Sequence, residues 1–104
     1  MKENKTIEQH QIWEVTGENF LAKPFSGKMV DRKILIGKGE KIEIRFPYAW
    51  HFRTEVDNNY FQADEESILK NCKYIGKIWS DIAFNNKAKL EEIIRLELFD
   101  KPKK

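Results

Sequence analysis

Apolar and polar residues alternate along residues 41–54, whose sequence is KIEIRFPYAWHFRT. The even positions from 42 to 52 are all apolar or aromatic, whereas most of the odd positions are charged or polar. A period of two is typical of a β-strand with one buried face. Because Pro47 lacks the N–H that a central strand donates, we expect two strands joined by a bend, or one long edge strand that curls. In both cases the even side chains enter the core.

Shorter β-forming segments, separated by turn residues, lie on both sides of this stretch. Further strands are predicted over Gln11–Thr16, Asn19–Ala22, Ile34–Ile36, Asn59–Ala63 and Lys73–Trp79. The turn at residues 17–19 is expected to return the second of these strands beside the first. Two glycines at Gly37–Glu40 predict the tight turn of a hairpin, and residues 54–63 predict a second hairpin.

Helical patterns are confined to the last third of the sequence. Residues 64–71 predict one or two helical turns, with Glu65 and Glu66 where the helix dipole favours acidic groups. Residues 80–86 are interpreted as a connector. Residues 87–99 carry apolar side chains at helical spacing and predict the main α-helix. Leu96 and Phe99 widen its apolar arc, which indicates either deeper burial of the helix or a homodimer or partner contact there.

These elements indicate one α+β domain. We expect five to seven short strands in a small twisted antiparallel sheet or a partly closed SH3- or OB-like barrel, packed by one short helical turn and a C-terminal α-helix. Residues 1–9 are interpreted as a flexible lead, residues 10–99 as the globular domain and residues 100–104 as a solvated tail.

Composition narrows the function classes only slightly. The chain has 104 residues, with 19 basic and 17 acidic side chains and a net charge of +2, so a nucleic-acid case depends on local clustering. A single cysteine and the lack of a secretory or membrane-spanning segment predict a cytoplasmic protein that does not enter a membrane. A composition rich in Lys, Asn, Ile and Glu suggests a bacterial or phage source.

The odd face of residues 41–53 is the candidate ligand site. Arginine forks suit phosphate or carboxylate groups, and an aromatic ring beside them is the combination that stacks bases. The alternative is an ordinary solvated strand face, on which the basic side chains pair with Glu43 and Glu55. The candidate ligand-binding residues are Lys41, Arg45, Tyr48, Trp50, His51 and Arg53.

Other chemistry has little support in the sequence. Cys72 and His51 lack the spacing of a thiolate pair, and Cys72 is better interpreted as a small buried residue. One cysteine and two histidines do not make a zinc site, and no cofactor motif is present, so we expect neither metal nor cofactor. Gly37 and Gly39 lack the third glycine of a phosphate loop. We therefore predict no catalytic residues.

The favoured hypothesis is a small non-enzymatic binding module for an anionic ligand, either nucleic acid or a nucleotide. The alternative is a protein-binding inhibitor, immunity or regulatory protein that acts on a larger partner through its sheet or its C-terminal helix. A small nuclease that uses His51 as its acid or base is the least favoured hypothesis, since no second proton-transfer group is specially placed.

Overall fold

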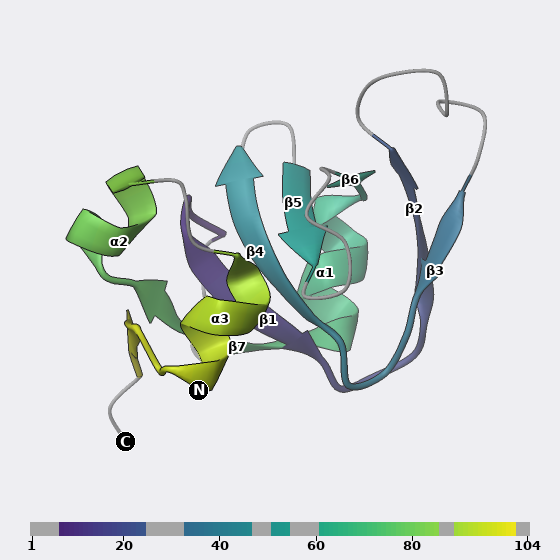
Figure 1. Cartoon of the computed structure of the whole chain (residues 1–104). Helices are drawn as coiled ribbons and strands as arrows, with labels where there is room; N and C mark the ends of the chain where they lie inside the picture. The colour runs from purple at the N-terminus through teal and green to yellow at the C-terminus, as the bar shows by residue number, and fades with distance from the viewer. Residues whose placement is uncertain (1–6, 25–32, 47–50, 55–60, 86–88, 102–104) are drawn as a thin grey trace.

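The computed structural model describes residues 7–24, 33–46, 51–54, 61–85 and 89–101, which hold eight strands and three short helices (Figure 1). In chain order these elements are β1 (Gln11–Val15), β2 (Phe20–Pro24), β3 (Ile34–Ile36), β4 (Lys41–Phe46), β5 (His51–Thr54), β6 (Phe61–Gln62), α1 (Glu65–Asn71), β7 (Cys72–Ile78), α2 (Ser80–Asn85), α3 (Leu90–Arg95) and β8 (Phe99–Asp100). No described helix exceeds seven residues, so the sheet is the main structural element of the domain.

The strands form one antiparallel sheet in the order β3-β2-β6-β5-β4-β1-β7-β8. The predicted α+β class with a small antiparallel sheet is therefore confirmed. The terminal strands β3 and β8 are not paired with each other, so the sheet is not a closed barrel. Membership of the SH3-like or OB-like class stays a prediction.

A long bent ribbon organises half of this sheet. β1 pairs with β4 and β2 pairs with β3 in nearly the same register. The segment that contains β1 and β2 therefore lies antiparallel to the segment that contains β3 and β4 along both pairs of strands. Both segments bend together where residues 16–19 lie beside residues 37–40. The N–H of Val15 donates to the Glu40 carbonyl at 2.9 Å, and the N–H of Gly39 donates to the Val15 carbonyl at 2.8 Å. The bend brings β2 round to pair with β6.

This bend corrects two sequence predictions. Residues 37–40 do not close a hairpin, because β3 and β4 pair with different strands, and β2 does not return beside β1. Gly39 has a φ of 95°, which its lack of a side chain permits, but the turn serves as a corner of the ribbon. The strand pairing of the other predicted hairpin is confirmed, since β5 pairs with β6 through His51↔Gln62 and Phe52↔Phe61, while its turn lies outside the described residues.

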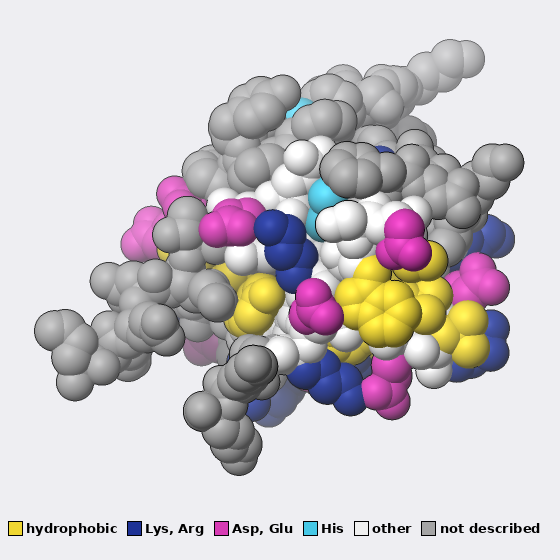
Figure 2. All heavy atoms as spheres, turned by 90° about the vertical axis from the view of Figure 1, so that its left-hand side faces the viewer, with side chains coloured by type: hydrophobic (Ala, Val, Ile, Leu, Met, Phe, Trp, Pro, Cys, Tyr) yellow, Lys and Arg dark blue, Asp and Glu magenta, His cyan; other side chains and the backbone are white. Residues whose placement is uncertain are grey.

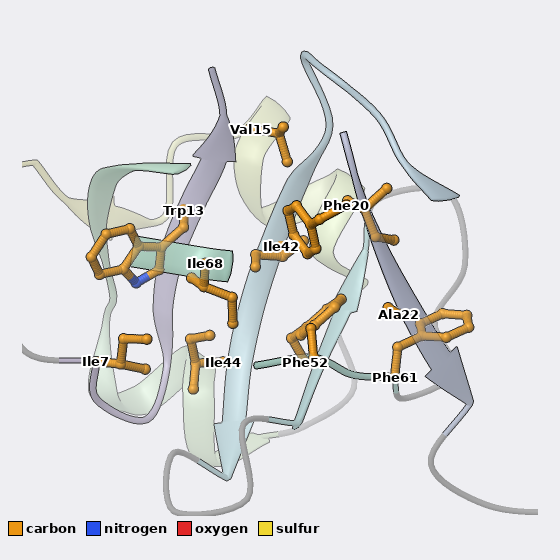
Figure 3. Packing of buried hydrophobic residues seen from close by; sticks show 12 residues of the cluster. Ile7, Trp13, Val15, Phe20, Ala22, Ile42, Ile44, Phe52, Phe61 and Ile68 are labelled. Atoms are coloured by element: carbon orange, nitrogen blue, oxygen red, sulfur yellow. The ribbon is translucent and has the colours of Figure 1, made fainter. Parts of the chain in front are cut away.

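The concave side of the bent sheet holds the larger core cluster. Figure 3 shows its side chains converging from β1, β2, β4 and β5, with Ile68 of α1 among them. Ile42, Ile44 and Phe52 are fully buried, as the alternating pattern predicted for the even positions. Among the described residues, the buried members of this cluster are Ile7, Trp13, Val15, Phe20, Ala22, Ile36, Ile42, Ile44, Phe52, Phe61, Ala63 and Ile68.

The opposite face of the sheet is also covered. α1 and α3 lie on opposite sides of the strands in Figure 1, and α3 packs the second core cluster. That cluster consists of Ile12, Ile78, Leu90, Ile93 and Phe99. The helical stripe that the sequence predicted is thus used for packing, and it covers the face on which polar residues had been expected to meet solvent.

The C-terminal helix is shorter than predicted. It ends at Arg95, because Glu97 adopts a left-handed φ of 56°. The N–H of Leu98 donates to the Ile93 carbonyl and the N–H of Glu97 to the Ile94 carbonyl, which is the Schellman pattern of helix termination. The chain then turns into β8, and residues 80–85, predicted as a connector, form α2. None of the described helices is long and apolar enough to span a bilayer.

Candidate functional site

Glu43 of β4 and the odd-numbered residues of β5, His51 and Arg53, are buried on the side of the sheet that α3 covers. Ile12, Glu43 and Arg53 are register partners on the neighbouring strands β1, β4 and β5, so they share one face of the sheet. Ile12 belongs to the cluster that α3 packs. Glu43 is 0% exposed, Arg53 is 5% exposed and His51 is 6% exposed. The expectation that this face projects into solvent is therefore wrong for these residues, because the C-terminal helix covers it.

Four charged or titratable side chains meet on this face. Both oxygens of the Glu43 carboxylate are engaged: Oε1 accepts a hydrogen bond from Arg53 Nε, and Oε2 lies 3.2 Å from Arg45 Nη1. The Nδ1 atom of His10 lies 3.4 Å from the same Oε2. We call these residues, His10, Glu43, Arg45 and Arg53, the Glu43 cluster.

The cluster keeps Glu43 ionised. Burial alone would raise the pKa of Glu43, but the hydrogen bond with His10 and the charges of Arg53 and Arg45 together hold this pKa below its ordinary value of 4.5. An ionised carboxylate without such partners would be very costly in this interior. The guanidinium groups thus already face an internal anion. The cluster is therefore better described as a buried ionic network than as a binding site for an external phosphate.

His10 enters the cluster through an unusual backbone. Its φ is 72°, a left-handed value that is uncommon for a residue with a side chain. Its N–H donates to the Ile44 carbonyl at 2.7 Å and its carbonyl accepts from the Ile78 N–H at 3.0 Å, so it joins β4 to β7 at the start of β1. These bonds fix the position of the imidazole against Glu43.

His10 was missed altogether in the sequence, and Glu43 was considered only as a pairing partner on a solvated face. Glu43 had a detectable signal, because a strand places residues 43 and 45 on one face and the two arginines needed an acidic partner. No local pattern marked His10, which precedes the strand and reaches the cluster only through its left-handed conformation.

The remaining predicted site residues are dispersed. Lys41 is half-buried at the start of β4, opposite Glu14. Tyr48 and Trp50 lie outside the described residues. Leu96 is 50% exposed, in line with a surface role, whereas Phe99 is 7% exposed within the second core cluster and does not present a contact surface.

Thiol chemistry with histidine has no geometric basis here. Cys72 lies on β7 and His51 on β5, with β1 and β4 between them. Burial raises the pKa of the Cys72 thiol to about 12, so the thiolate is scarce at neutral pH. Burial also lowers the pKa of His51 and favours its neutral form. Among the described residues, no three His, Cys, Asp or Glu side chains gather as a metal site requires.

An apolar pair is exposed at the other end of the sheet. Leu21 on β2 and Leu35 on β3 are register partners and are 56% and 57% exposed. Their strand neighbours Phe20, Ala22 and Ile36 are buried, so the two leucines share the outer face of the ribbon. We call them the Leu21–Leu35 pair. Single exposed leucines are common, but two directly opposite each other form a continuous apolar surface.

The surface near α2 and α3 has a different character. Figure 2 shows this side of the molecule, on which acidic and basic side chains are interspersed with hydrophobic ones. Trp79 is 41% exposed there, and its indole Nε1 donates to Asp100 Oδ1 at 3.1 Å. The described part of this face is therefore mixed in charge and lacks the basic stripe that tracks a nucleic-acid backbone.

Comparison of the chain with protein-family models, with curated proteins and with solved structures gave no match.

Proposed function

We propose that the chain is a non-enzymatic module that binds another protein. The observation that carries this proposal is the Leu21–Leu35 pair, two large apolar side chains that remain more than half exposed on an edge of the sheet. Burying a leucine side chain contributes roughly 1.5–3 kcal/mol, so a partner that covers both would gain appreciable affinity.

Two further features favour a surface contact over a small-molecule pocket. Three hollows that described residues line, with volumes of about 360, 380 and 480 Å³, are open to solvent and not enclosed. Glu43, an ionisable residue that is 0% exposed, is already engaged by Arg45 and Arg53 of the same chain. A His51-dependent nuclease receives the least support, since His51 is 6% exposed and burial lowers its pKa.

The proposal predicts a separable effect of the two leucines. Replacing both, Leu21→Thr with Leu35→Thr, keeps β-propensity and is expected to leave the thermal midpoint close to that of the wild type. Peptides selected from a random display library against the wild-type chain are expected to lose at least tenfold in affinity for this double variant. Titration calorimetry of several selected peptides measures the change.

Matched substitutions at other exposed leucines give the control. Leu69→Gln on α1 and Leu96→Gln at the end of α3 remove leucines that are 42% and 50% exposed. Both variants are expected to bind the selected peptides as the wild type does. Loss of binding in Leu96→Gln alone would move the interface to the C-terminal helix, and unchanged binding in the double threonine variant would refute the proposal.

An anionic ligand is the second candidate function. The Glu43 cluster holds two guanidinium groups against one carboxylate, and the Arg45 side chain retains 11% exposure. A nucleotide or single-stranded oligonucleotide is then expected to bind at low salt, to weaken as salt rises and to bind less tightly to Arg45→Gln. Fluorescence anisotropy with a labelled oligonucleotide and with ATP tests both ligands, and a lack of binding at low salt eliminates this candidate.

A further inference from the structure

We infer that the partner presents an acidic extended segment, which pairs as an additional strand with β3 beside the Leu21–Leu35 pair. This inference rests on the proposed function and names the chemistry of its partner. It follows from three features of the same edge: a side of the terminal strand with which no described strand pairs, lysines around the apolar pair, and a hollow beside it.

The first feature is the strand edge itself. β3 is the last strand of the sheet and pairs with β2 on one side only. No other described strand pairs with its second side, where backbone N–H and C=O groups alternate. An extended peptide that adds to such an edge gains main-chain hydrogen bonds whatever its sequence, and its side chains supply the specificity.

The second feature is the charge around the leucines. Lys23 follows Leu21 by two residues and Lys33 precedes Leu35 by two, and both lysines are exposed. In extended chain this spacing places each lysine on the same face as its leucine. Lys38, which is also exposed, follows the C-terminal end of β3. An added strand with alternating apolar and acidic side chains would therefore cover the leucines and meet the ammonium groups.

The third feature is a depression beside this surface. Leu21, Lys23 and Lys33 line a hollow of about 380 Å³ together with residues of β6 and the start of α1. Asp64 and Ser67 lie on its helical side, so its lining has one acidic group against two basic ones. The hollow offers space for an apolar or carboxylate side chain of the partner segment.

A second copy of the chain fits this edge less well. Antiparallel pairing of two β3 strands brings Lys33 of one copy towards Lys38 of the other, because these lysines precede and follow the strand. Like charges placed opposite each other across strands are destabilising. Lysine beside an edge strand is a known protection against self-pairing, and the same lysines are complementary to an acidic segment.

The test uses short synthetic peptides with alternating valine and glutamate, and matched peptides with lysine in place of glutamate. The glutamate peptide is expected to bind at least tenfold more tightly, and its affinity is expected to fall several-fold as salt rises from about 50 to about 500 mM. Nuclear magnetic resonance shifts are expected at the amides of Ile34–Ile36. The double variant Lys23→Glu with Lys33→Glu is expected to prefer the lysine peptide.

Backbone pairing is tested with the same peptide after N-methylation of alternate amides, which is expected to abolish binding. Equal binding of the acidic and basic peptides, shifts elsewhere on the chain, or no binding by either peptide would overturn this inference. The proposed function is judged separately, because library peptides that depend on Leu21 and Leu35 but carry no acidic bias would uphold it.

Discussion

Replacing Glu43 by glutamine is expected to lower the free energy of unfolding by about 3–5 kcal/mol, the usual cost of removing one partner from a buried ion pair. The side chain is 0% exposed, and glutamine keeps its size while removing the negative charge. Arg53 and Arg45 would then remain in the interior without their anion. Small domains are stable by only about 5–15 kcal/mol, so the effect would be large in urea denaturation.

Two variants distinguish this charge effect from a general sensitivity of the sheet. Glu14→Gln changes the same residue type on the adjacent strand β1, where the side chain is half-buried, and is expected to cost no more than about 0.5 kcal/mol. Replacing Glu43, Arg45 and Arg53 together by leucine is expected to recover much of the lost stability, since neither guanidinium group then remains in the interior without Glu43. Equal losses for Glu43→Gln and Glu14→Gln would contradict the assigned role.

The pH dependence gives an independent readout of the same variant. Because the folded pKa of Glu43 lies below its ordinary value of 4.5, the ionised side chain contributes its full stabilisation above that value. The contribution is lost as pH falls from about 4.5 through the lower folded pKa. The stability difference between wild type and Glu43→Gln is therefore expected to shrink on acidification from neutral pH towards pH 3. A constant difference would indicate that packing, and not charge, is responsible.

Local alternation predicted the buried side of β4 and β5 correctly because side-chain direction in a strand is a local property. It placed Ile42, Ile44 and Phe52 in the core, where all three are fully buried. Whether the other face meets water depends on a segment about forty residues further along the chain. The burial of Arg53 and Glu43 therefore followed from the docking of α3, which alternation does not specify.

The bend of the ribbon shows a second limit of local patterns. Glycine and asparagine at residues 16–19 and 37–40 signal a change of direction, and a hairpin and a corner use the same residue types. The two outcomes differ only in which strands pair across the turn. Here Asn19 Oδ1 accepts from the N–H of Lys38 at 3.0 Å, so the two turns are joined to each other. That contact between distant residues is what makes each turn a corner.

The predicted end of the C-terminal helix was wrong because of the backbone conformation of one residue. Glutamate is a good helix former, and helices that end in a left-handed residue usually have glycine there. Glu97 adopts this conformation nonetheless, and the chain leaves the helix before Phe99. Phe99 then packs as part of β8 in the second core cluster. Of the two interpretations of Phe99, deeper burial is the one observed, but a strand and not the helix buries it.

Replacing Gly76 by alanine is expected to release β8 from the sheet. An added Cβ would come within 2.5 Å of Phe99 Cδ2 and closer still to the Asp100 carbonyl oxygen, and the latter is backbone that cannot rotate away. Overpacking of this kind costs about 1–3 kcal/mol, and more where backbone must move. The expected result is a lower urea midpoint, with faster hydrogen exchange at Lys77 and Ile78, the partners of β8.

Gly37→Ala is the matched control, because a Cβ at that position would meet nothing nearer than Glu40 Oε2 at 3.4 Å, an ordinary contact. That variant is expected to keep wild-type exchange at β7. If Gly76→Ala exchanged and unfolded like Gly37→Ala, the close approach of β8 to β7 would be refuted. Phe99 would then no longer be fixed by strand pairing. In that case α3 alone would cover the face of the sheet on which the Glu43 cluster is buried.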